Sequence, residues 1–223
     1  VDSGCITAII GPNGSGKSTL FNVISRLVLH DKGSAYFAGK NISLLSDVDV
    51  ARLGVSRTFQ EVRLFRNLTI EDHLQIALSD TDEMYFFSLL RGTKRTRDLH
   101  DKRMREILHV VGLHKPLSTL AVDVSYGQRK LLDLAIAIAK PHSLILLDEP
   151  VAGVNPHLRA EIKKILTTLK KRGETVVLIE HDMNFVMDIA ERIIVLDEGM
   201  ILADGKPVDI QRNRKVLEAY LGD

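Results

Sequence analysis

The amino-acid sequence predicts one α/β domain over residues 1–223, with a mostly parallel sheet as its core and an inserted helical subdomain. Three observations predict this class. Near the start, a short apolar segment is followed by a glycine-rich turn and a helical pattern. From residue 144 onward, apolar segments alternate with amphipathic ones, as in parallel strands joined by helices. Between them lies a long, charged stretch with few glycines and prolines. We place the core at about 1–67 and 140–223 and the helical subdomain at about 68–139.

The first half of the core begins with a strand and a helix. Residues 5–10 are apolar and β-branched, which favours a buried strand. Residues 18–26 have helical spacing. The expected apolar face of this helix consists of Leu20, Val23, Ile24 and Leu27. Short strands are expected at 33–38 and 55–59, with a turn at Gly39 and Lys40.

The second half of the core repeats this alternation. Buried parallel strands are short continuous apolar runs, whereas amphipathic helices place apolar residues three or four positions apart. We therefore expect strands at 144–147, 175–179 and 192–196, and helices at 158–171 and 184–190. In the helical subdomain, residues 104–111 also have helical spacing.

The glycine-rich segment at 11–18 carries the strongest chemical signal. It fits the pattern G-x-x-x-x-G-K-[ST] and lies between a strand and a helix, as that pattern requires. The glycines allow a tight turn whose N–H groups converge on phosphate oxygens, while Lys17 adds a positive charge and Ser18 offers a hydroxyl to Mg²⁺. We call this segment the phosphate loop. The nucleotide-binding residues predicted here are Gly11, Pro12, Asn13, Gly14, Ser15, Gly16, Lys17, Ser18 and Thr19.

Two consecutive carboxylates, Asp148 and Glu149, follow the apolar run at 144–147. They should lie at the carboxyl edge of the sheet, where α/β proteins bind ligands. Asp148 is suited to hold Mg²⁺ through water, and Glu149 to polarise an attacking water. Such a pair alone is usually the start of a solvated loop. The phosphate loop upstream favours the chemical interpretation.

Residues 124–128, which read VSYGQ, precede another helical pattern. Ser125 is a natural helix N-cap. The same helix end can also hold an anion through its N–H groups and dipole. On these residues alone, both interpretations stay open.

Five elements occur in one order: the phosphate loop, Gln60, a Ser-x-Gly-Gln segment at 125–128, the pair Asp148 and Glu149, and His181. In this order the chain resembles the ATP-binding subunit of ATP-binding cassette (ABC) transporters, over nearly its whole length. The resemblance implies a P-loop NTPase fold of the ABC type. It also implies ATP hydrolysis that powers transport across a membrane, with ATP and Mg²⁺ as cofactors.

The resemblance also implies a role for each matching residue. Glu149 would be the general base, and His181 would contact the γ-phosphate. Gln60 would lie where the core meets the helical subdomain and would sense Mg²⁺ and the membrane partner. The implied catalytic residues are thus Glu149, His181 and Gln60, and the implied metal-binding residues are Ser18, Gln60 and Asp148.

Partners follow from the same resemblance. Ser125, Gly127 and Gln128 would bind the γ-phosphate of ATP held by a second cassette, identical or homologous. Membrane-spanning permease subunits would complete the transporter, and a solute-binding protein would act indirectly. The expected location is peripheral, at the cytoplasmic face of the inner membrane. A net charge of +1 does not indicate the strongly basic surface that nonspecific nucleic-acid binding needs. Nucleic acid is therefore not expected as a partner.

Within the family, several segments resemble importers of branched-chain amino acids. They are residues 57–65, Tyr126, residues 151–156 and residues 215–222. The ATPases of urea or short-amide importers and of lipopolysaccharide exporters are the nearest alternatives. From other classes, the alternatives are a clamp that binds ATP without hydrolysing it and a soluble cassette that acts on DNA or the ribosome.

Three features depart from the family pattern. Tyr126 stands where a glycine is common, and Asn155 stands where the family usually has aspartate. The family's first strand, with its adenine-stacking aromatic, is expected to be missing from this chain, so no stacking residue is assigned.

An apolar segment at 84–90 is either core of the helical subdomain or a docking patch for the membrane partner.

Overall fold

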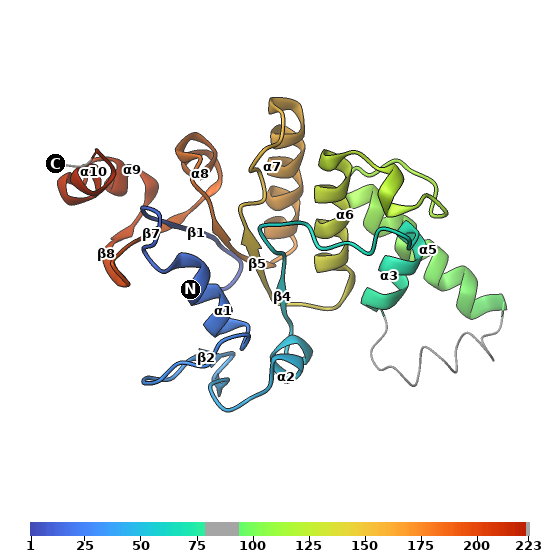
Figure 1. Ribbon diagram of the computed structural model, residues 1–223, viewed down its shortest axis with the longest axis horizontal. Helices are drawn as coiled ribbons and strands as arrows, with labels where there is room; N and C mark the ends of the chain where they lie inside the picture. The colour runs from blue at the N-terminus through green and yellow to red at the C-terminus, as the bar shows by residue number, and fades with distance from the viewer. Residues whose placement is uncertain (79–93, 222–223) are drawn as a thin grey trace. The chain divides into compact units, whose positions relative to one another are not determined.

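A computed structural model describes residues 1–78 and 94–221 (Figure 1). The segment at 84–90 lies outside them. The chain divides into two compact units, the first formed by residues 1–60, 142–153 and 166–223 and the second by residues 61–141 and 154–165. Among the described helices, none is both long and apolar enough to cross a bilayer.

The first unit is built on a six-stranded sheet with the order β4-β5-β6-β1-β7-β8. Its strands are β1 (Ile6–Ile10), β4 (Val55–Arg57), β5 (Leu144–Asp148), β6 (Thr175–Ile179), β7 (Arg192–Asp197) and β8 (Met200–Gly205). All neighbouring pairs are parallel except β7 and β8. The predicted α/β class with a mostly parallel sheet is confirmed.

The centre of this sheet is apolar on both faces. All five residues of β1 and all five of β6 are buried. Helix α1 (Lys17–Ile24) packs on the sheet through Phe21, which is fully buried. The predicted apolar face of this helix was wrong in part, because Leu20 and Leu27 are exposed. The helix turns Lys17 and Phe21, one turn apart, towards the interior instead.

Beside the sheet, the first unit carries a small hairpin and a short helix. The hairpin pairs β2 (Tyr36–Phe37) with β3 (Lys40–Asn41). Its loop residues, Ala38 and Gly39, have φ angles of 49° and 77°. Two positive φ angles are typical of a type I′ turn, so the turn lies one residue earlier than the spacing indicates. Helix α2 (Asp47–Arg52) follows it.

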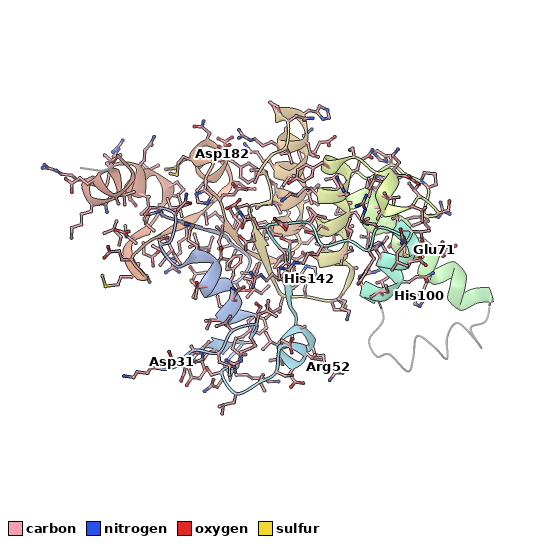
Figure 2. The ribbon with its side chains drawn as sticks, viewed as in Figure 1. Asp31, Arg52, Glu71, His100, His142 and Asp182 are labelled. Atoms are coloured by element: carbon pink, nitrogen blue, oxygen red, sulfur yellow. The ribbon has the colours of Figure 1, made fainter. Side chains whose placement is uncertain are left out.

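Three helices complete the first unit: α8 (Met183–Ile189), α9 (Pro207–Gln211) and α10 (Arg214–Leu221). Asp182, labelled in Figure 2, caps α8 by accepting a hydrogen bond from Phe185 N at 3.0 Å. Helix α8 follows the segment that holds His181, so the cap helps to fix that segment.

The second unit is helical. It contains α3 (Ile70–Leu78), α5 (Lys94–Val110), a 3₁₀ turn (Ala121–Asp123), α6 (Tyr126–Ala139) and the first part of α7 (Pro156–Lys171). Helices α3, α5 and α6 pack against one another (Figure 1). Fully buried side chains from the three helices, Leu74, Met104 and Leu132 among them, contribute to the core of this unit.

Candidate active site

Four strands of the first unit deliver the predicted chemical residues to one edge of the sheet. Because β1, β4, β5 and β6 are parallel, their carboxyl ends lie on the same side. The phosphate loop follows β1, Glu149 follows β5, and His181 comes two residues after β6. Gln60 comes three residues after β4. This edge is where open α/β sheets bind ligands.

The phosphate loop is tightly packed at its start. A Cβ atom at Gly11 would lie 2.0 Å from the carbonyl oxygen of Leu196 and 2.8 Å from Ser15 Oγ. No side chain fits there, so this position requires glycine. The loop ends in α1, whose first N–H groups have no partners within the helix and are suited to bind phosphate.

The Lys17 side chain lies over this loop and is only 6% exposed. Its Nζ donates hydrogen bonds to the carbonyl oxygens of Gly11 and Pro12, each at 2.8 Å, and to Ser15 Oγ at 3.3 Å. Burial lowers the pKa of Lys17, and the nearby Glu149 and Asp148 carboxylates oppose that shift. The ammonium is therefore held close to both predicted acidic residues of the site.

The three predicted catalytic residues meet at the carboxylate of Glu149, which contacts both Gln60 and His181. Gln60 Nε2 donates to Glu149 Oε2 at 3.1 Å, and His181 Nε2 lies 3.0 Å from Glu149 Oε1. The Glu149 side chain is 16% exposed. A carboxylate with both oxygens held and one edge open to solvent is suited to orient a water molecule.

The backbone of Glu149 is strained. Its φ angle is 50°, in the left-handed region that residues with a Cβ atom rarely adopt. Its N–H donates to the carbonyl of Ile179 at 3.0 Å, which fixes the residue to the end of β6. Strained residues of this kind cluster at functional sites.

Asp148 is 4% exposed and is held by two neighbours. Its backbone N–H donates to Thr58 Oγ1 at 3.3 Å, and its Oδ2 lies 3.4 Å from an Arg57 nitrogen. Together with the Ser18 hydroxyl at the start of α1, this carboxylate offers oxygen ligands of the type that Mg²⁺ prefers. The residues present therefore fit the predicted ion.

Sequence reasoning missed the role of Arg57, which it used only as a marker of the subfamily. The Arg57 guanidinium also donates to Asn22 Oδ1 and Ser25 Oγ, both at 2.8 Å. It stacks over the rings of Phe21 and Phe59, at 5.6 and 5.0 Å from their centroids. Arg57 thus joins α1, β4 and the end of β5. No sequence motif signalled these contacts, because its partners are far apart in the chain.

The signature segment, residues 125–128, lies in the second unit. Ser125 Oγ accepts from Gln128 N at 3.3 Å, and Gln128 Oε1 accepts from Ser125 N at 3.0 Å. This capping box confirms the N-cap interpretation. A Cβ atom at Gly127 would lie 2.6 Å from Leu158 Cδ2, so the glycine lets α6 approach α7 closely. Phosphate binding by Ser125, Gly127 and Gln128 stays a prediction.

The two residues that depart from the family pattern, Tyr126 and Asn155, have different surroundings. The ring of Tyr126 is in the first turn of α6, and the residue is 46% exposed. Asn155 Oδ1 accepts from Leu158 N at 2.9 Å, immediately before α7. Asparagine is among the best helix caps, so this residue has a clear structural role.

A phosphate loop after β1, a carboxylate pair at the end of β5 and a mostly parallel sheet define a nucleotide-binding protein of the P-loop class. The sequence profile of the ABC transporter family matches residues 1–152. The chain belongs to that family and is one of its ATP-binding cassettes. A second profile, for the branched-chain amino acid ATP-binding cassette transporter, matches residues 200–223.

Relatives of known name agree with this assignment. The chain is 38% identical to a probable branched-chain amino acid transport ATP-binding protein, LivG, of Archaeoglobus fulgidus, covering 100% of this chain and 86% of the relative. It is 35% identical to the high-affinity LivG protein of Escherichia coli strain K12, covering 98% and 87%. The lipopolysaccharide export system ATP-binding protein LptB of Haemophilus influenzae is 32% identical, covering 100% and 88%.

Solved structures agree too. An ATP-binding cassette of an ABC transporter superposes with a TM-score of 0.85 at 32% identity, covering 100% of this chain and 90% of the other. A dimeric cassette in a post-hydrolysis state with ADP and phosphate has a TM-score of 0.79 at 27% identity, covering 93% and 87%. The predicted family, fold and activity class, a transport-coupled ATPase, are confirmed.

Proposed function

We propose that this chain hydrolyses ATP with Mg²⁺ and powers the import of branched-chain amino acids. One observation carries the hydrolytic part. The Glu149 carboxylate is held between Gln60 and His181, at the sheet edge that also carries Lys17. A binding clamp would need the phosphate loop, but it would not need a positioned acceptor for a water proton.

Each side chain has a distinct task in this proposal. Lys17 and the N–H groups at the start of α1 bind the phosphates. Glu149 accepts a proton from the attacking water, while Gln60 and His181 keep its two oxygens in place. Ser18, Gln60 and Asp148 would hold Mg²⁺ through their side-chain oxygens. The ion would offset negative charge on the phosphates.

The transported substrate is inferred from the relatives. Two of the three relatives described above are named for branched-chain amino acid transport, and the profile that matches residues 200–223 carries the same name. The similarity to a lipopolysaccharide export protein is lower, at 32%. Import of branched-chain amino acids is therefore favoured over lipopolysaccharide export and over urea or amide import.

The proposed assembly is a pair of cassettes on membrane-spanning permease subunits, at the cytoplasmic face of the inner membrane. The dimeric solved cassette supports pairing. In such a pair, Ser125 of one copy would face the phosphate loop of the other. A solute-binding protein would deliver the amino acid to the permease.

The direct test of hydrolysis is Glu149→Gln in the full-length protein. This change keeps the shape of the side chain and removes its basicity. We expect ATP binding to persist, hydrolysis to fall by ~10²–10⁴-fold, and an ATP-bound dimer to accumulate in gel filtration. Glu198→Gln is the matched control, since Glu198 also has a positive φ, 46°, and is an exposed residue of the turn that contacts the phosphate loop through Gly199 N and Ser15 O, at 3.2 Å.

Three results would contradict the proposal at different levels. Equal hydrolysis by parent and Glu149→Gln would show that Glu149 is not the base. Long-lived ATP dimers without phosphate release in both would favour the clamp. The substrate is tested in cells in which the full-length form of this protein replaces their own branched-chain amino acid transport ATPase. The measurement is uptake of labelled leucine, isoleucine, valine and urea. Uptake of urea alone would overturn the assignment of branched-chain amino acids as the substrate.

A further inference from the structure

A second buried carboxylate lies next to the candidate active site. Glu180 directly follows β6 and is 2% exposed. Its Oε1 accepts a hydrogen bond from Val151 N at 2.8 Å, and its Oε2 accepts one from His181 N at 3.2 Å. Burial raises the pKa of Glu180, with a contribution from the nearby Glu149 charge, while these two N–H groups oppose the shift.

The environment of Glu180 excludes it as the base that meets water. Its oxygens are buried and face backbone N–H groups, whereas the Glu149 carboxylate is partly open to solvent. A buried acidic side chain is unfavourable unless hydrogen bonds stabilise it, and here the N–H groups of Val151 and His181 supply them.

Glu180 closes a set of links between two loops of the first unit. One loop carries Glu149 and Val151, and the other carries Glu180 and His181. The backbone of Glu149 donates to the Ile179 carbonyl at 3.0 Å, and the side chains of Glu149 and His181 meet at 3.0 Å. The Glu180 carboxylate adds the third link, from Val151 N to the backbone of His181.

We propose that Glu180 is a positioning residue for ATP hydrolysis, which fixes the loop after Glu149 and the His181 backbone in one arrangement. It acts through Glu149 and His181 and does not touch the nucleotide. The inference rests on the proposed function, since it concerns the same reaction. It adds a residue that none of the sequence motifs contains.

The test compares Glu180→Gln and Glu180→Ala with the parent in the full-length protein. Glutamine has one acceptor oxygen and loses one of the two backbone bonds, and alanine loses both. We expect kcat to fall about 10-fold for glutamine and about 100-fold for alanine, because small misplacements of catalytic groups have effects of that size. The KM and calorimetric Kd for ATP should change less than about twofold, since the phosphate loop is untouched.

Glu174→Gln is the matched control, because Glu174 lies at the opposite end of β6. Its Oε2 is 2.6 Å from Nε2 of His142, which Figure 2 labels. This variant should lower thermal stability without changing kcat. If the kcat of the Glu180 variants falls only in proportion to their folded fraction, as for a purely structural residue, the proposal is wrong.

A double-mutant cycle tests the route of action. If Glu180 works through His181, then Glu180→Gln should cause little further loss of kcat in a His181→Ala background. Fully additive losses would contradict the proposal.

Hydrogen exchange gives a readout that does not depend on turnover. In Glu180→Ala the amides of Val151 and His181 should exchange at least about tenfold faster, and in Glu174→Gln they should not. Unchanged exchange would overturn the link whether or not the parent hydrolyses ATP. An inactive parent with the expected exchange pattern would instead count against the proposed function.

Discussion

At the scale of single residues, the Lys17 ammonium is already positioned by the loop where phosphate is expected to bind. Three oxygens of the loop already hold its ammonium. Phosphate oxygens would replace or join them, and a charged hydrogen bond typically contributes about 1.5–3 kcal/mol. Lys17→Ala should therefore weaken ATP binding at least tenfold, roughly, by calorimetry. Lys32→Ala, at an exposed loop position, should bind as the parent does. Equal affinity in both variants would contradict this role.

The sequence predicted the residues whose roles come from local motifs, and missed those whose roles come from long-range contacts. Lys17 lies in a contiguous pattern, so its place on the loop followed from spacing. The meeting of Gln60, Glu149 and His181 followed from the resemblance and from the rule that parallel strands end on one edge. Glu180 was not foreseen, because its partner Val151 is 29 positions away and offers only a backbone N–H.

At the scale of elements, α6 contains a side chain that should make stability depend on pH. Burial raises the pKa of Asp133 to about 7, and the charge of Lys130 opposes this shift. The folded chain therefore keeps a proton that the unfolded chain loses near pH 4. Stability should fall as pH rises from about 4 to 7, by up to about 4 kcal/mol, and stay low above that range.

Asp133→Asn should remove this dependence. The amide is neutral at every pH, so we expect its melting temperature to exceed that of the parent by up to about 8–16 °C at pH 8 and by less at pH 5. Asp123→Asn, on an exposed residue of the same unit, is the control. The interpretation fails if the two variants have the same pH profile of unfolding.

Element boundaries were predicted well where burial is uniform and less well where it is not. Strand β6 agrees with the expected range because all five of its residues are buried and all except Thr175 are apolar. The face assigned to helix α1 was wrong in part, because Leu20 and Leu27 are exposed, whereas Phe21 and Ile24 pack against the core. The spacing of apolar residues indicates a possible helix face, but it does not show which of those side chains contact the sheet.

At the scale of the whole molecule, two copies should share their sites. Alone, neither Ser125→Arg nor Lys17→Ala should form an ATP-dependent dimer. Mixed, they should leave one intact site, with the phosphate loop of the Ser125 variant and the signature segment of the Lys17 variant. We expect an ATP-induced heterodimer in light scattering.

A second variant separates this effect from the loss of a helix cap. Ser125→Asp keeps a good N-cap but places a negative charge opposite phosphate, so it should fail like Ser125→Arg. Absence of any dimer in the mixture, with both variants folded, would argue against sites shared between copies.

The left-handed backbone of Glu149 has a consequence for how this chain responds to selection. A side chain with a Cβ atom in that conformation costs about 1–3 kcal/mol, which glycine would recover in part. Thermal stability therefore favours glycine at position 149, whereas turnover of ATP requires glutamate there. A screen that rewards only survival at high temperature should enrich glycine at 149. The selected glycine variants would be more stable and would still bind ATP, yet they would lack the carboxylate that orients the attacking water.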